Sequence, residues 1–191
     1  SCTRSQNTFS RAHYKIVDLD ENFADKVIKQ FLNYVDYNHS IFSQPEIDSI
    51  YGNRDKILRA LNYCDLSYPY EIYNIALRKR FNKYSYFIKA VKEGIDTAGN
   101  RSISLDRRKT PYVADESALK SLWHDEITNE YINQILNDKT PEEAKNKLIK
   151  RYEAALKKLV QTKSEDAFSV YENSYATAID PHTNYFSPQD S

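Results

Sequence analysis

Glycine is scarce in this chain, which holds only three glycines among 191 residues. Glycine is the usual residue of the tight turns on which β-sandwiches and β-barrels depend. Its scarcity therefore favours long helices over many short strands. Long apolar runs are also missing, and none approaches the ~20 residues that a membrane-spanning helix requires.

An excess of either charge is missing as well. Lys plus Arg and Asp plus Glu both total 27, so the formal net charge is zero. A dedicated nucleic-acid binder normally carries a basic surplus, and the balance argues against that class. Hydrophobic residues make up 40% of the chain, with 16 Tyr and 8 Phe, which is enough large side chain to build a core.

Cysteine is nearly absent and methionine is wholly absent. The two cysteines, Cys2 and Cys64, are too few for a disulfide framework in a chain of this length, and they do not indicate a compartment. Because Cys64 follows an apolar stretch, we expect it to be buried as a small hydrophobe. Since the chain does not begin with Met and ends at Ser191, we expect a piece of a longer protein.

Apolar residues recur every three or four positions through most of the chain, which predicts an all-α, irregular domain of about seven helices over residues 18–179. Helix starts are expected at Asp20, at Ser43 with Glu46 in capping-box spacing, at Asp115 and at Ser164. The strongest start is Thr140-Pro141-Glu142-Glu143, because it combines an N-cap, a proline at the first helical position and a glutamate at the third. A long helix is expected from Pro69 to Gly94, with an apolar face formed by Tyr73, Leu77, Phe81, Tyr84, Ile88 and Val91.

Three segments break this period. Residues 1–17 are expected to be a loose N-terminal segment, and residues 180–191 the start of a linker. Residues 94–114 predict one long loop, and a loop of that length is uncommon unless it is functional or packs on something else. Its basic group is the best candidate for a partner surface, with a solvated loop as the simpler interpretation: Arg101, Arg107, Arg108 and Lys109.

Motifs for metal, phosphate or nucleophilic chemistry are not found. No two of the four histidines stand at metal-ligand spacing, and no glycine-rich phosphate loop occurs, so no cofactor is expected. Asp180 and His182 could form an acid–base pair, but no serine stands in a nucleophile context. The simpler interpretation is that Asp180 and Thr183 cap a turn.

Several segments, in order along nearly the whole chain, resemble one family. They are Phe9–Tyr14 followed by Asp18–Asp20, Phe31–His39, Leu105–Pro111 followed by Leu122–Trp123, Lys150–Tyr152 followed by Leu159–Phe168, and Ile179–Pro188. Together they are similar to the N-terminal domain of tail-specific, or carboxy-terminal processing, proteases. Tyr112 departs from the family's pattern, because a tryptophan is common after that proline.

The resemblance implies a periplasmic serine endopeptidase that degrades proteins with apolar C-terminal tails. In that family a PDZ domain captures the tail and a Ser–Lys pair performs acyl transfer, and neither lies within these residues. It implies a domain without catalytic, cofactor or metal residues, which packs around its own PDZ and protease domains and frames substrate access. It also implies a helical-repeat lipoprotein as an adaptor in some members, and a location that is free in the periplasm or at the periphery of the inner membrane. The junction to the protease would comprise Asp180, Pro181, His182, Thr183 and Tyr185.

Two other functions stay open at this point. The chain could be a stand-alone helical adaptor or scaffold that keeps the fold without a protease. It could also be a self-sufficient hydrolase that uses His182 with Asp180, which is the weakest of the three because the motif is short. Neither alternative involves nucleic acid or a transmembrane segment.

Overall fold

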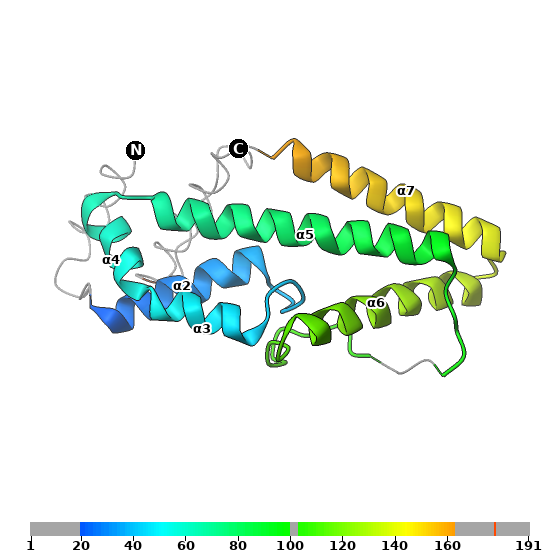
Figure 1. Ribbon diagram of the computed structural model, residues 1–191, viewed down its shortest axis with the longest axis horizontal. Helices are drawn as coiled ribbons and strands as arrows, with labels where there is room; N and C mark the ends of the chain where they lie inside the picture. Colours follow the sequence, from blue (N-terminus) through cyan, green and yellow to red (C-terminus); the bar gives the residue numbers. More distant parts are fainter. Residues whose placement is uncertain (1–19, 100–102, 163–177, 179–191) are drawn as a thin grey trace. The chain divides into compact units, whose positions relative to one another are not determined.

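The computed structural model describes residues 20–99, 103–162 and 178, and these residues form helices without a β-strand. Their order is shown in Figure 1. The all-helical prediction is confirmed. The helices within this part of the chain are α2 (Glu21–Val35), α3 (Gln44–Gly52), α4 (Arg54–Tyr63), α5 (Ser67–Glu93), α6 (Glu116–Leu136) and α7 (Pro141–Val160).

The remaining predicted helix, expected to start at Ser164, lies outside the described residues, as do the predicted boundaries at residues 17 and 180. The described residues cluster into two compact units. Unit 1 holds residues 20–37 and 46–75, and unit 2 holds residues 38–45 and 76–162.

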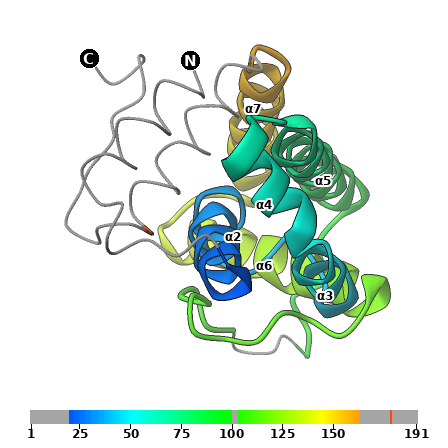
Figure 2. The ribbon, with the colours of Figure 1, turned by 90° about the vertical axis from the view of Figure 1, so that its left-hand side faces the viewer.

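Unit 1 is built on the contact between α2 and α4, which lie side by side in Figure 2. Helix α2 begins where predicted, because the Asp20 carboxylate accepts the backbone N–H of Phe23 at 3.0 Å. Apolar residues three or four apart then bury one face of the helix, as its period requires. The buried large side chains of α2 are Phe23, Val27, Ile28, Phe31, Leu32 and Val35.

Cys64 differs from the prediction. It lies just past the last residue of α4 as its C-cap, in a left-handed conformation with φ of 54°. There it is half-buried and disulfide-bonded, and is not a small hydrophobe within the core. The apolar face of α4 ends earlier, at Leu61, and the chain has turned away from it by Cys64. The other cysteine, Cys2, lies outside the described residues.

Helix α5 is the longest element, with 27 residues that begin in unit 1 and end in unit 2. At 1.5 Å per residue it is about 40 Å long. It stops just before Gly94, as predicted, and Gly94 has a φ of 101° that suits glycine.

The predicted apolar face of α5 is partly wrong. Phe81 was expected to face the core, yet 41% of it is exposed. The buried positions are Pro69, Ile72, Ala76, Phe87 and Val91, and Lys83 lies between Ala76 and Phe87 with only 12% of its side chain exposed. This row contains a small alanine and an inward lysine. A search for regularly spaced large apolar residues therefore does not identify it as the buried face.

The core of unit 2 is formed by three helices, α5, α6 and α7 (Figure 1). Phe87 and Tyr152 meet edge to face with ring centroids 4.9 Å apart, an arrangement that the ring quadrupoles favour. Burying each large side chain contributes about 1.5–3 kcal/mol. The buried cluster comprises Phe87, Val91, Leu119, Trp123, Ile127, Leu148 and Tyr152.

Both helix starts in unit 2 are confirmed. Asp115 accepts the backbone N–H of Ala118 at 2.8 Å and caps α6. Thr140 and Glu143 form a reciprocal capping box at the start of α7, with Pro141 in the first turn. Within the described residues, none of the helices combines the length and the apolar character needed to cross a bilayer.

Candidate functional site

The residues predicted to matter fall into two groups. The predicted junction, Asp180 to Tyr185, and Arg101 of the basic group lie outside the described residues. Arg107, Arg108 and Lys109 lie in the loop between α5 and α6, which is without helix over 95–99 and 103–115. The candidate site is therefore this loop together with the part of unit 2 that holds it.

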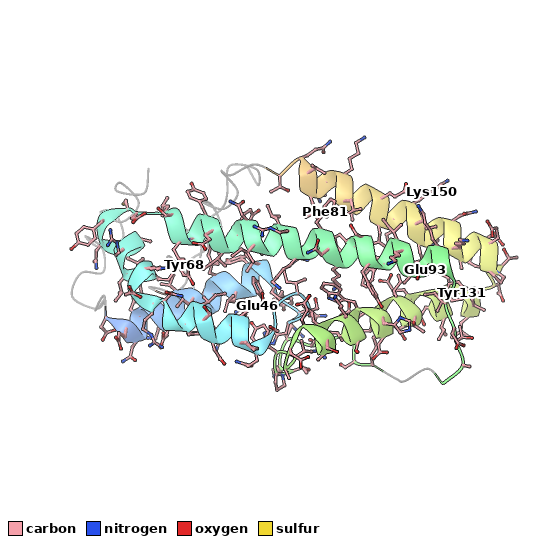
Figure 3. The ribbon with its side chains drawn as sticks, viewed as in Figure 1. Glu46, Tyr68, Phe81, Glu93, Tyr131 and Lys150 are labelled. Carbon is pink, nitrogen blue, oxygen red and sulfur yellow. The ribbon has the colours of Figure 1, made fainter. Side chains whose placement is uncertain are left out.

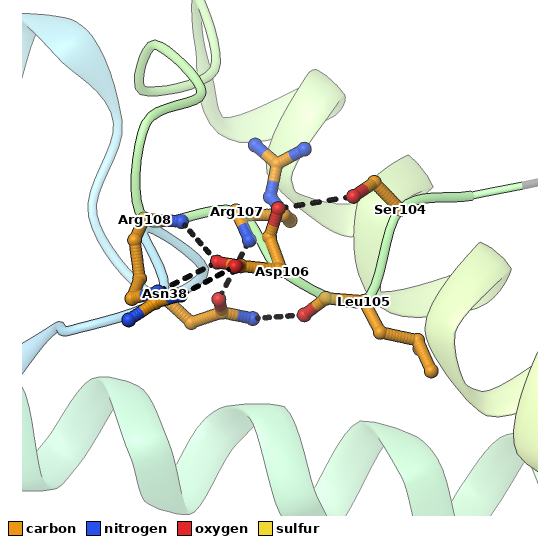
Figure 4. A network of polar contacts seen from close by, with 6 residues as sticks. All are labelled: Asn38, Ser104, Leu105, Asp106, Arg107 and Arg108. Atoms are coloured by element: carbon orange, nitrogen blue, oxygen red, sulfur yellow. Dashed lines mark hydrogen bonds and ion pairs between the residues drawn. The ribbon is translucent and has the colours of Figure 1, made fainter.

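Asn38 fastens the loop through both atoms of its side-chain amide. Its Nδ2 donates to the Leu105 carbonyl at 3.1 Å, and its Oδ1 accepts the backbone N–H of Arg107 at 2.8 Å (Figure 4). One side chain thus satisfies a donor and an acceptor of a loop that is almost 70 residues away in sequence, since the second bond spans 69 positions. A loop without secondary structure needs such partners for its backbone groups.

Asp106 organises the loop from within. Its carboxylate accepts the Arg108 backbone N–H at 3.2 Å and the Arg108 guanidinium at 2.8 and 2.7 Å, while its carbonyl accepts the Ser104 hydroxyl (Figure 4). The hydrogen bonds from Arg108 lower the pKa of Asp106 to about 2. Arg108 is therefore engaged inside the loop, and its charge is largely neutralised there.

His39 holds the far end of the same loop. Its Nδ1 lies 2.6 Å from the Thr110 carbonyl, so this nitrogen must carry the hydrogen and donate it. The His39 ring also stacks on Tyr112 with centroids 3.9 Å apart. A few residues on, the Gln44 N–H donates to the Val113 carbonyl at 2.8 Å and Ser43 bridges to Val113. Segment 38–45 thus contacts the second half of the loop, from Leu105 to Val113.

A buried polar cluster lies in the same unit. The Ser40 carbonyl accepts the Trp123 indole N–H at 2.7 Å, and the Ser40 hydroxyl accepts from the Lys83 ammonium at 3.0 Å. Lys83 also forms an ion pair with Glu126 at 2.8 Å, and their side chains are only 12% and 17% exposed. The cluster joins α5, α6 and segment 38–45.

The electrostatics of this cluster are dominated by burial. Desolvation raises the pKa of Glu126, and the positive charges of Lys83 and Arg107 offset that rise only in part, while Glu130 adds to it. Glu126 Oε1 and Arg107 Nε are both buried without a hydrogen-bond partner among the described residues. Arg107 thus contributes a positive charge near Glu126, while its Nε makes no hydrogen bond there.

The serine–lysine contact in this cluster does not have the features of a catalytic pair. A lysine acts as a general base only when it is free of its proton. The Lys83 ammonium neutralises a carboxylate at 2.8 Å, and Ser40 is only 5% exposed, so a substrate would not reach its hydroxyl. The arrangement can hold the loop and segment 38–45 together, and that is a structural task.

The three described residues of the predicted basic group differ in their surroundings. Arg107 is half-buried near Glu126, and Arg108 is paired with Asp106. Lys109 is exposed on the surface. The residues that hold the loop were not predicted individually, namely Asn38, His39, Ser40, Lys83, Trp123 and Glu126. A signal for three of them existed. Asn38 and His39 end the segment Phe31–His39 and hold the segment Leu105–Pro111, and Trp123 belongs to the segment Leu122–Trp123. All three segments had been singled out for their family resemblance.

Comparison with known proteins supports that resemblance. A family model described as the tail specific protease N-terminal domain matches residues 6–189. The tail-specific protease of Haemophilus influenzae (strain ATCC 51907 / DSM 11121 / KW20 / Rd) is 35% identical over 189 residues, which cover 97% of this chain and 27% of that protein. The chain thus spans about a quarter of the length of this curated relative. The chain belongs to the tail-specific protease family and corresponds to its N-terminal domain.

Proposed function

We propose that this chain is the accessory helical domain of a serine endopeptidase that degrades proteins with apolar C-terminal tails. The observation that carries the proposal is the match over 97% of the chain to only 27% of a tail-specific protease. In this proposal the PDZ domain and the Ser–Lys pair belong to the rest of the enzyme. The helical domain frames the access of substrates and contacts the catalytic core or an adaptor, such as a helical-repeat lipoprotein.

The way in which the loop is held supports a framing role. Loops that carry function are commonly positioned by a rigid scaffold. Here Asn38, His39 and the Lys83–Glu126 pair position a loop whose Leu105 is 69% exposed. We propose that Leu105 and Lys109 contact another part of the enzyme or its substrate. The segment Asp180 to Tyr185 would then be the junction to the protease domain.

A periplasmic location fits the state of Cys64. Disulfides persist in oxidising compartments such as the bacterial periplasm and are rare in the cytosol. Cys64 is disulfide-bonded, which supports a proposal that the family resemblance alone had raised.

The second candidate is a helical adaptor or scaffold that acts without a protease. Both candidates share the fold, so the fold cannot distinguish them. Reading the gene downstream of Ser191 does: a PDZ pattern followed by a serine and a lysine of the protease supports the first candidate, and a stop codon supports the second.

The absence of catalytic residues is tested by incubating the 191-residue chain with a protein that carries an apolar C-terminal tail. We expect no hydrolysis. Sustained cleavage that His182→Ala abolishes would contradict the proposal and support the third alternative, a hydrolase that uses His182 and Asp180.

A further inference from the structure

Cys64 stands directly after α4 in a backbone conformation that few residues other than glycine adopt. Its φ of 54° lies in the left-handed region, where a side chain comes too close to the neighbouring carbonyl. Gly94 fills the corresponding place after α5, as is usual at a helix end. The backbone at Cys64 would suit glycine better, so the reason for a cysteine there lies in its side chain.

That side chain is engaged in a disulfide bond. The 191 residues contain one other cysteine, Cys2, which lies outside the described residues. We propose that Cys64 is bonded to Cys2 of the same chain, and that this bond closes the N-terminal end of the chain onto the end of α4 in a way that a thiol reductant reverses. This inference stands whether or not the chain acts within a protease.

The bond forms by thiol–disulfide exchange with a donor disulfide such as oxidised glutathione. One cysteine thiolate attacks the donor and displaces the first donor thiol, which leaves a mixed disulfide on the chain. The second cysteine thiolate attacks the chain's sulfur in that mixed disulfide and displaces the second donor thiol. The two cysteines thereby lose two electrons and two protons, and the donor gains them as two thiols. Two equivalents of a thiol reductant reverse the exchange.

The closure would act on one part of the fold. A bond between positions 2 and 64 closes a loop of about 60 residues that holds α2, α3 and α4. A disulfide stabilises mainly by restricting the unfolded chain, and more so when the loop is long. Helices α6 and α7 lie outside this loop. The bond is therefore expected to protect α2 and α4 against opening and to leave α6 and α7 nearly unaffected.

The turn around Cys64 is held by contacts that do not involve the sulfur. The Asp65 carboxylate accepts the backbone N–H and the hydroxyl of Ser67 at the start of α5, at 3.2 and 2.5 Å. The ring centroid of Tyr68, in the first turn of α5, lies 5.2 Å from the Lys56 ammonium of α4 (Figure 3). Cys64 itself is half-buried and not enclosed in a core. We therefore expect a reductant to open the bond while the turn keeps its shape.

The pairing is tested on the full-length protein, purified without reductant, by alkylation of free thiols, digestion with trypsin and mass spectrometry. We expect the peptide that carries Cys2 and ends at Arg4 to be joined to the peptide Ala60–Arg78, and the two to separate on reduction. Cys64 joined to a cysteine of a second chain or to one beyond Ser191 would overturn the proposal. So would recovery of Cys64 as an alkylated thiol.

The closure is tested by amide hydrogen exchange of the same protein. Cys2→Ser removes the bond and leaves the turn at Cys64 unchanged, and Cys64→Ser removes it from the other side. We expect each variant to speed exchange in α2 and α4 at least about tenfold, and the double variant to add nothing further. Reduction of the parent should have the same effect, with a change of less than about twofold in α6 and α7. Equal exchange in α2 and α4 of the parent and Cys2→Ser would overturn the proposed closure.

Discussion

The side-chain oxygen of Asn38 accepts the backbone N–H of Arg107 at 2.8 Å, across 69 positions of sequence. The nitrogen of the same amide donates to the carbonyl of Leu105. A single residue at the start of segment 38–45 thereby fixes the course of the long loop before α6. Three consequences of this arrangement and of the cluster beneath it can be measured, and a fourth concerns the start of α7.

The first prediction concerns Asn38 itself. Asn38→Ala removes both hydrogen bonds, and at about 0.5–1.5 kcal/mol for each we expect a loss of about 1–3 kcal/mol in the free energy of unfolding by urea. Trypsin should then cut faster after Arg107, Arg108 and Lys109. The control Asn133→Ala, at an exposed position of α6, should leave the rate of cutting unchanged. Equal rates for the two variants would mean that Asn38 does not hold the loop.

The second prediction concerns Lys83. Lys83→Met keeps the length of the side chain but leaves the buried Glu126 carboxylate without its partner, which costs about 3–5 kcal/mol when such a pair is broken on one side. We expect this loss in urea unfolding at pH 7 and a smaller loss at pH 4, where the carboxyl gains a proton. A variant as stable as the parent at pH 7 would contradict the assigned pair.

The third prediction concerns Glu126. Here removal of the charge is expected to keep or raise the stability at pH 7, whereas Lys83→Met is expected to lower it. Burial raises the pKa of Glu126 in the folded chain, so the folded state binds this proton more tightly than the unfolded state does. The contribution of Glu126 to stability is therefore greatest below its unfolded pKa and falls as the pH rises through the raised folded pKa. Glu126→Gln resembles the protonated form and can still accept from Lys83.

Consequently Glu126→Gln should be at least as stable as the parent at pH 7, and the two should become equal near pH 4. Urea unfolding at both pH values measures this. A parent that is clearly more stable than Glu126→Gln at pH 7 would show that attraction to Lys83 and Arg107 exceeds the desolvation of the carboxylate.

The fourth prediction concerns the capping box of α7. Thr140→Ala removes the side chain that accepts the Glu143 backbone N–H, and loss of such a cap costs about 1 kcal/mol. Thr140→Ser keeps the hydroxyl and serves as the control. Thermal unfolding should separate the two variants by a few degrees. Identical melting temperatures would mean that the cap does not stabilise α7.

Local signals explain why much of the fold could be predicted. The caps at Asp20, Asp115 and Thr140 lie within a few residues of the amides that they satisfy, so the sequence contains both partners side by side. The same holds for Gly94 at the end of α5. Helix starts and ends of this kind can be predicted without knowledge of the tertiary structure.

The face of α5 and the candidate site could not be predicted for the opposite reason. Lys83 occupies an inward position because Glu126 and Ser40 meet it there, and those residues lie 43 positions away from it on either side. Hydrophobic periodicity predicts that a lysine is exposed and a phenylalanine buried, and it therefore predicted that Phe81 would face the core. Contacts such as those of Asn38 with Leu105 and Arg107 have no local pattern at all.

Cys64 shows the same limit in another form. Two cysteines in a long chain do not indicate a disulfide by their number, and the position of Cys64 just past an apolar helix resembled that of a core residue. Its bonded state depends on the tertiary structure.

The proposed accessory role is tested most directly by the degradation of a protein with an apolar C-terminal tail, and of the same protein with a polar tail, by the full-length protease with and without residues 1–178. Circular dichroism establishes that the shortened protein is folded, and Asn38→Ala in the full-length protein provides a second, milder perturbation. We expect the loss of the helical domain to change the rate of degradation or the preference for the apolar tail. Unchanged rate and unchanged preference in a folded, shortened protease would contradict it.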